Sequence, residues 1–102
     1  VPMEAFHLPP GDTPHIETVL RPGDLVLSIR LPAQAAARRS HYVKVRDRAS
    51  FAWALASAAV ALRVADERVV EARVAVGGVA TRPWRLPAVE QALLGRALDA
   101  AT

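Results

Sequence analysis

Two apolar runs joined by a short polar turn constrain the fold of this chain more than any other feature. Residues 58–64 and 69–76 both carry β-branched valines, and the tetrapeptide Ala65-Asp66-Glu67-Arg68 connects them. β-Branched residues favour strands, and a short polar connection between two such runs is typical of a β-hairpin. We therefore expect a long antiparallel hairpin in the middle of the chain.

Strict alternation of apolar and polar residues predicts two further strands upstream of the hairpin. Leucine and isoleucine alternate with other residues over 25–31, and a second alternating run covers residues 40–46. A period of two residues is the pattern of a half-buried strand. The outer face of the second run carries an aromatic ring and two cations: Tyr42, Lys44 and Arg46.

Short helices complete the expected fold. Ser50 suits the N-cap of a helical turn over residues 51–56, and Pro87 suits the first turn of a helix over residues 88–94 that ends at Gly95. We expect an α+β sandwich in which a small antiparallel sheet of three or four strands has helices packed on one face. The expected buried stripe of the second helix is Val89, Ala92 and Leu93, and the other expected core residues are Phe51, Trp53, Leu55, Val60, Leu62, Val74 and Val76.

Composition excludes several classes of site and partner. The 102 residues include no cysteine, so disulfides, thiolate metal sites and cysteine nucleophiles are absent. No run reaches the roughly 18 apolar residues of a membrane helix, and the N-terminal residues lack the pattern of a signal peptide. The net charge of +3 is spread along the chain with few aromatic residues. We expect no nucleic acid, no membrane partner and a cytoplasmic location.

The sequence contains no complete constellation for catalysis or metal binding. The three histidines lack the spacing of metal ligands, and no serine lies in a nucleophile elbow. Asp66 and Glu67 fall in the expected turn, where carboxylates are normally solvated. Gly77-Gly78 predicts a bulge or a close backbone approach at the end of the hairpin. A linker is expected at residues 33–37, and Asp99 is expected to cap a further helix.

One strand face carries the side chains that are most suited to binding. Tyr42, Lys44 and Arg46 share this face, and Arg48 extends it into the next loop. A ring could stack on the tyrosine while the cations hold a phosphate. An ordinary solvated sheet face has the same pattern. The pattern alone therefore favours the solvated face and leaves an anion or nucleotide site as an alternative.

Three stretches, taken in order, resemble one known family. They are HYVKVRDRAS (residues 41–50), ASAAVAL (56–62) and ARVAVGGVA (72–80), and they are followed by Arg82-Pro-Trp-Arg85 and Glu90. They are similar to the C-terminal domain of the FAD-binding (medium) subunit of molybdenum hydroxylases, a family that includes carbon monoxide dehydrogenase and xanthine dehydrogenase. The upstream LPPGDTP and RPGDLVLSIRLP resemble the segment that joins the two halves of that subunit.

The resemblance implies an organisation and a cofactor. Residues 1–24 would be an extended linker from a missing FAD-binding domain, and residues 25–102 would be the C-terminal flavoprotein domain, truncated at its end. Because the chain lacks an initial Met and the family's glycine-rich FAD segments, we expect a fragment or a processed product that is inactive alone. In such enzymes electrons pass from a molybdopterin large subunit through an iron–sulfur small subunit to FAD, and then to NAD or another acceptor.

The resemblance also implies roles for three residues. Tyr42 matches an aromatic position near the isoalloxazine ring, Arg48 matches a basic position near the same pocket, and Lys44 belongs to the same Tyr-x-Lys motif. These three side chains are expected to bind FAD. The expected partners are the preceding FAD-binding domain, the iron–sulfur small subunit and the molybdopterin large subunit. The alternative function is a non-catalytic protein-interaction module that binds through its sheet edge or its proline-rich first quarter.

Overall fold

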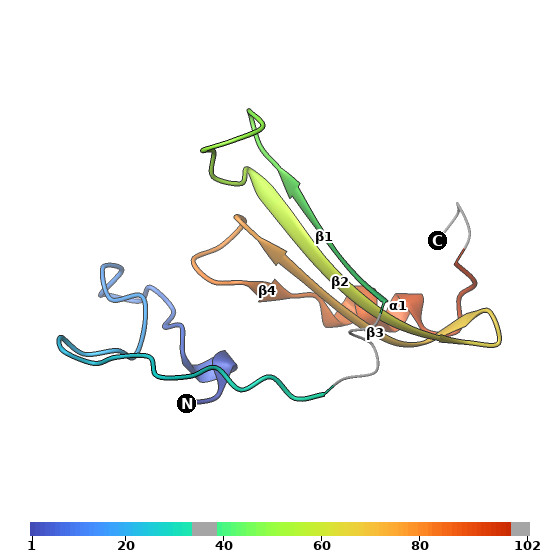
Figure 1. Cartoon of the computed structure of the whole chain (residues 1–102), viewed down its shortest axis with the longest axis horizontal. Helices are drawn as coiled ribbons and strands as arrows, with labels where there is room; N and C mark the ends of the chain where they lie inside the picture. Colours follow the sequence, from blue (N-terminus) through green and yellow to red (C-terminus); the bar gives the residue numbers. More distant parts are fainter. Residues whose placement is uncertain (34–38, 99–102) are drawn as a thin grey trace. The chain divides into compact units, whose positions relative to one another are not determined.

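The computed structural model describes residues 1–33 and 39–98, which form two compact units (Figure 1). The first unit, Val1–Pro32, contains the 3-10 helix η1 (Met3–Ala5) and an antiparallel bridge between His7 and Thr18. The second unit, Ala33–Thr102, contains the sheet. Most of the expected linker at 33–37 and the expected cap at Asp99 lie outside the described residues.

The prediction of a strand over residues 25–31, which rested on alternation, is wrong. These residues have no regular structure, and Leu25, Leu27 and Leu31 are exposed. A turn precedes them at Arg21-Pro22-Gly23-Asp24, where the Asp24 N–H donates to the Arg21 carbonyl at 3.0 Å. Alternation supplies the side-chain pattern of a strand but not the neighbouring backbone that must pair with it. None of the strand pairings in the described part of the chain includes this segment.

The second unit is built on a four-stranded antiparallel sheet with the order β1-β2-β3-β4. Its strands are β1 (Ser40–Val45), β2 (Ala56–Ala65), β3 (Arg68–Gly77) and β4 (Trp84–Arg85). The expected central hairpin is therefore confirmed as β2 and β3. Its two turn residues, Asp66 and Glu67, have φ values of 49° and 59°, which is the backbone of a tight hairpin turn.

Helical structure is less extensive than expected. The mixed α+β class is confirmed, but the described residues of the second unit contain one short helix, α1 (Pro87–Leu93), so helices packed across a face are not confirmed. The helical turn expected over residues 51–56 is wrong, because the chain is irregular there until β2 begins at Ala56. Pro87 does occupy the first turn of α1, and Gly95 follows its end with φ +77°.

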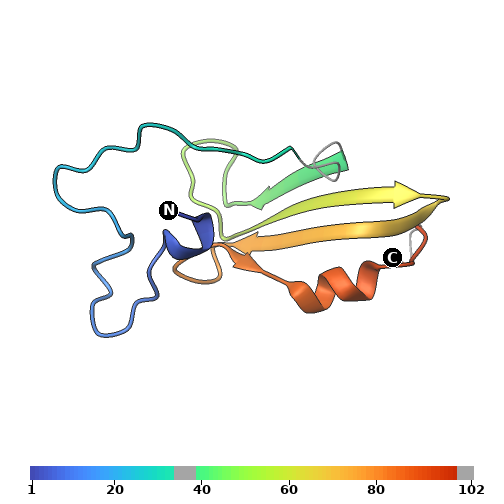
Figure 2. The ribbon, with the colours of Figure 1, turned by 90° about the horizontal axis from the view of Figure 1, so that it is seen from below.

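Helix α1 runs beside the outer edge of β3 (Figure 2). After the helix the chain returns to the same edge, where the Gly95 N–H donates to the Val69 carbonyl at 2.8 Å and the Val69 N–H donates to the Arg96 carbonyl at 2.9 Å. Strand β4 covers the other end of this edge. The segment from β4 to Arg96 thus closes an edge that would otherwise expose unpaired backbone groups.

The buried core is small. In the described ranges its buried apolar residues are Val69, Ala72 and Val74, and of these Val69 is fully buried. Among the expected core residues, Val74 is buried and Val60, Leu62 and Val76 are half-buried. The expectation is wrong for Phe51, Trp53 and Leu55, which are exposed because they lie in the β1–β2 connection and no element packs over them.

The tandem glycines allow two segments to approach closely, as expected. A Cβ on Gly77 would lie 2.7 Å from the Ser57 Oγ, and a Cβ on Gly78 would lie 3.1 Å from the Leu55 carbonyl oxygen. Gly78 also has φ +79°, a conformation that favours glycine. The irregularity in the sheet register lies elsewhere, between Arg63 and Val64. Gly77 therefore lets the end of β3 lie close to β2, and Gly78 lets it lie close to the β1–β2 connection.

Gly78→Ala should destabilise the second unit more than Gly95→Ala does. Both glycines have nearly the same positive φ, but a Cβ at Gly95 meets no atom within 4 Å. We expect Gly95→Ala to cost about 1 kcal/mol from the backbone conformation alone and Gly78→Ala to cost about 1 kcal/mol more. Urea unfolding of both variants measures the difference. Equal losses would show that the close approach at Gly78 does not matter.

Candidate functional site

The sheet register places Tyr42 and Arg85 on the same row. Tyr42 pairs with Ala59 on β2, Ala59 pairs with Ala75 on β3, and Ala75 pairs with Arg85 on β4. Residues directly opposite in an antiparallel sheet share a face, so a tyrosine and an arginine stand at the two ends of a row whose centre is alanine. The Tyr42 side chain is 59% exposed.

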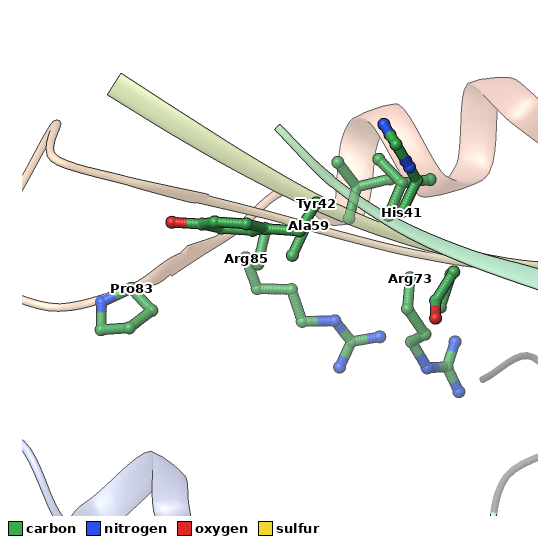
Figure 3. Close-up of a pocket in the computed structure, with 11 residues that line it drawn as sticks. His41, Tyr42, Ala59, Arg73, Pro83 and Arg85 are labelled. Carbon is green, nitrogen blue, oxygen red and sulfur yellow. The ribbon is translucent and has the colours of Figure 1, made fainter. Parts of the chain in front are cut away.

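An open hollow of about 740 Å³ covers this row. The neighbouring row adds Ser40, Ala61 and Arg73, and Pro83 lies at the rim. In Figure 3 the Arg73 and Arg85 side chains extend to one side of the strands, whereas His41 extends to the other. The hollow exists because the alanines leave room between the longer side chains at its ends. It is therefore a shallow, flat-bottomed surface with a phenol and two guanidinium groups around it.

Arg85 is held in position by a buried carboxylate. Its Nε and Nη2 each donate to a Glu90 oxygen at 2.8 Å, which is the bidentate geometry of a strong ion pair. Glu90 lies on α1 and is only 6% exposed, while Arg85 remains largely exposed beside the hollow. The carboxylate thus fixes the arginine without covering it. Of the expected buried stripe of α1, Val89 and Ala92 are exposed and Leu93 is half-buried, whereas Glu90 is buried.

Glu90 also completes the outer edge of β3. The Leu86 N–H donates to the Val74 carbonyl at 2.9 Å, as the next pair of the β3–β4 ladder requires. The Leu86 carbonyl has turned into α1, where it accepts the Glu90 N–H at 3.1 Å, so it no longer faces Val74. The Glu90 Oε1 accepts the Val74 N–H at 3.0 Å in its place. A side-chain oxygen therefore continues the ladder where the backbone leaves it.

These contacts lower the pKa of Glu90 from its ordinary value of 4.5 to about 2. The largest cause is the hydrogen bond from Arg85, and the bond from the Val74 N–H acts in the same direction, whereas burial opposes both. The same pairing raises the pKa of Arg85, so this side chain stays charged. Glu90 is consequently ionised at neutral pH.

Arg73, the second cation of the hollow, has looser partners. Its Nη1 donates to the Ala72 carbonyl at 3.1 Å, and its Nη2 lies 3.4 Å from Glu71. Glu71 also pairs with Arg63 at 3.4 Å. Exposed pairs of this length contribute little free energy, so Arg73 can reorient toward a ligand more easily than Arg85 can.

The three residues that are expected to bind FAD from the family resemblance lie in different surroundings. Tyr42 borders the hollow, whereas Lys44, on the same face of β1, borders a smaller recess with Phe51, Ala52 and Trp53. The Arg48 Nη2 donates to the Phe51 carbonyl at 2.7 Å, so this guanidinium holds the loop. Tyr42 and Lys44 are thus available for a ligand, and Arg48 is one residue that supports the loop beside them.

Sequence reasoning missed Arg73, Arg85, Phe51 and Trp53 as members of this surface. Arg85 and Glu90 both occur in the segments that resemble the family. That Arg85 on β4 pairs with Glu90 on α1 could be seen only in the three-dimensional structure. The arginines reach the Tyr42 face only through a register that spans four strands. Alternation within one strand cannot supply that register.

The arrangement suits a flat ligand that carries negative charge. A planar ring can lie over alanine beside the phenol of Tyr42, and guanidinium or ammonium groups can face anionic atoms. FAD has such a ring and a diphosphate, so the donor set fits it. No group of histidine, aspartate or glutamate residues in the described ranges could hold a metal ion. Within the same ranges no helix is long and apolar enough to cross a membrane.

The chain is similar to known flavoprotein sequences. The model of the family described as CO dehydrogenase flavoprotein C-terminal domain matches residues 41–102. The aldehyde oxidoreductase FAD-binding subunit PaoB of Escherichia coli (strain K12) is 47% identical to this chain over 88 residues. The match covers 86% of this chain and 26% of that subunit, so the chain spans about a quarter of its relative's length.

Acid should weaken the second unit through Glu90. Because the pKa of Glu90 is lower in the folded chain, its contribution is complete above pH 4.5 and is lost as the pH falls from 4.5 toward 2. We expect Glu90→Gln to cost about 1–3 kcal/mol at pH 7 and to flatten the stability profile below pH 4.5. Glu71→Gln, which removes an exposed pair, should cost less than about 1 kcal/mol. Urea unfolding between pH 7 and pH 2 makes the comparison, and identical profiles for Glu90→Gln and the unmodified chain would contradict it.

Proposed function

Because this chain belongs to the family of CO dehydrogenase flavoprotein C-terminal domains, we propose that its sheet forms one wall of an FAD site in a molybdenum hydroxylase flavoprotein. The observation that carries the proposal is the row from Tyr42 to Arg85. It presents an exposed ring and a fixed guanidinium on either side of an alanine floor.

Each residue of the hollow has a separate task in this proposal. Tyr42 offers the face or edge of its ring to the isoalloxazine, and the small alanines leave space for a flat group. Arg85, held by Glu90, keeps a positive charge at a fixed position where an anionic atom of the cofactor can lie. Lys44 has no ion pair with another described residue, so its ammonium is available for a second anionic atom.

The remaining parts of the proposal follow from the family. FAD supplies electron transfer when it is bound, and the relay would run from iron–sulfur clusters to NAD or another acceptor. The partners would be an FAD-binding domain, an iron–sulfur small subunit and a molybdopterin large subunit, assembled in the cytoplasm. The name of the Escherichia coli relative, an FAD-binding subunit of an aldehyde oxidoreductase, supports this function over a stand-alone interaction module.

Tyr42→Ala should weaken FAD binding in a hybrid subunit. We define this hybrid as Escherichia coli PaoB in which the present chain replaces the stretch that aligns with it. Loss of the ring should raise the dissociation constant of FAD about tenfold, and Tyr42→Phe should restore most of the affinity. Titration of the flavin-free hybrid with FAD, followed by flavin fluorescence, gives the constants.

The matched control is Val43→Ala, because Val43 lies on the opposite face of the same strand and does not line the hollow. It should leave FAD affinity within about twofold of the unmodified hybrid. If Tyr42→Ala and Val43→Ala have the same effect, the Tyr42 face is not a wall of the flavin site.

A further inference from the structure

Two aromatic side chains beside the candidate site are almost fully exposed. Phe51 is 96% exposed and Trp53 is 95% exposed. Both belong to the connection between β1 and β2, residues 46–55, which we name the aromatic loop. Phenylalanine and tryptophan contribute most of their free energy when they are removed from water, and clusters of them at a surface mark interaction sites.

The conformation of the aromatic loop is fixed by specific contacts. The Arg48 Nη2 holds the Phe51 carbonyl at 2.7 Å, and the Leu55 N–H donates to the Val45 carbonyl at 2.9 Å. The Leu55 carbonyl oxygen lies so close to Gly78 that a Cβ there would be only 3.1 Å from it. Phe51 itself has φ +48°, which is unfavourable for a bulky side chain and persists only where the surroundings enforce it. The backbone that carries the two rings therefore has a defined conformation.

Three cations lie at the same end of the sheet as the two rings. Lys44 borders the same recess as Phe51 and Trp53, and Arg46 begins the loop. Arg82 lies in the β3–β4 connection at the same end of the sheet, because Val76 pairs with Trp84 there. None of the ion pairs between described residues involves these three cations. Aromatic rings with arginine around them have the composition of binding hot spots in protein interfaces, and their charge favours an acidic partner.

We propose that the aromatic loop docks this chain onto the flavin-carrying remainder of an FAD-binding subunit. The partner surface would hold an apolar recess for Phe51 and Trp53, with carboxylates facing Lys44, Arg46 and Arg82. This inference rests on the proposed function. It is supported by the Escherichia coli relative, of which 74% lies outside the match, since the match covers 26%. Lys44 links the loop to the Tyr42 face, so a partner docked there also borders the hollow.

Hydrogen exchange measured by mass spectrometry tests the contact directly. The isolated chain and the flavin-loaded hybrid subunit are compared peptide by peptide. Docking should slow amide exchange over residues 46–55 at least tenfold in the hybrid. The hairpin turn at Asp66 and Glu67 lies at the opposite end of the sheet and should exchange equally in both proteins.

A double variant separates docking from folding. Phe51→Ser with Trp53→Ser removes two exposed rings, so the isolated chain should keep its circular dichroism spectrum. In the hybrid it should lower the yield of soluble subunit at least fivefold and remove the protection of residues 46–55. Val70→Ser, which removes an exposed apolar residue near the far end of β3, should change neither quantity.

The outcomes distinguish this inference from the proposed function. If the amides of the aromatic loop exchange as fast in the flavin-loaded hybrid as in the isolated chain, the docking proposal is overturned. The proposal of a flavin site on the Tyr42 face is then unaffected. If the loop is protected but Tyr42→Ala does not change FAD affinity, the docking proposal is supported and the proposed flavin site on the Tyr42 face is contradicted. If the unmodified hybrid does not fold where PaoB does, docking is also overturned, because a complementary loop should let this chain replace its relative.

Discussion

The ion pair between Glu90 and Arg85 is the interaction on which the rest of the second unit depends. Its carboxylate satisfies the Val74 N–H at the point where the backbone leaves β4 for α1. Without it, a buried donor on β3 would have no partner and α1 would lose its polar anchor to the sheet. The same carboxylate fixes the guanidinium that borders the hollow. One side chain thus links the stability of the sheet edge to the geometry of the candidate site.

A sheet with so few buried apolar residues depends on such edge contacts more than a well-packed domain does. Val69, Ala72 and Val74 are the buried apolar residues of the described ranges, and all three lie on β3, the strand whose outer edge is closed. The β1 side carries the exposed ring of Tyr42 and the aromatic loop, together with Lys44 and Arg46, which form no ion pair with a described residue. The buried apolar residues therefore lie toward the closed edge of the sheet, whereas the aromatic loop follows β1 at the other edge.

Local patterns predicted the parts of this structure that depend on local chemistry. Valine-rich runs around a polar turn predicted the β2–β3 hairpin, and Pro87 predicted the start of α1. Alternation failed over residues 25–31 because it cannot say whether a neighbouring strand exists. Phe51 and Trp53 were expected in the core but are exposed, and Glu90 was not expected there but is buried. The shared face of Tyr42 and Lys44 followed from their spacing within one strand, whereas the position of Arg73 and Arg85 on that face required the register between the strands.

Nuclear magnetic resonance of the Val74 amide tests the central interaction most directly. If Glu90 accepts this N–H while it is paired with Arg85, the amide proton shift of Val74 should titrate with an apparent pKa of about 2, and the amide should exchange slowly at pH 7. In Glu90→Gln the titration should disappear. A Val74 shift that titrates near 4.5, or fast exchange at neutral pH, would contradict the account, because Glu90 would then be a solvated carboxylate that neither closes the sheet edge nor positions Arg85.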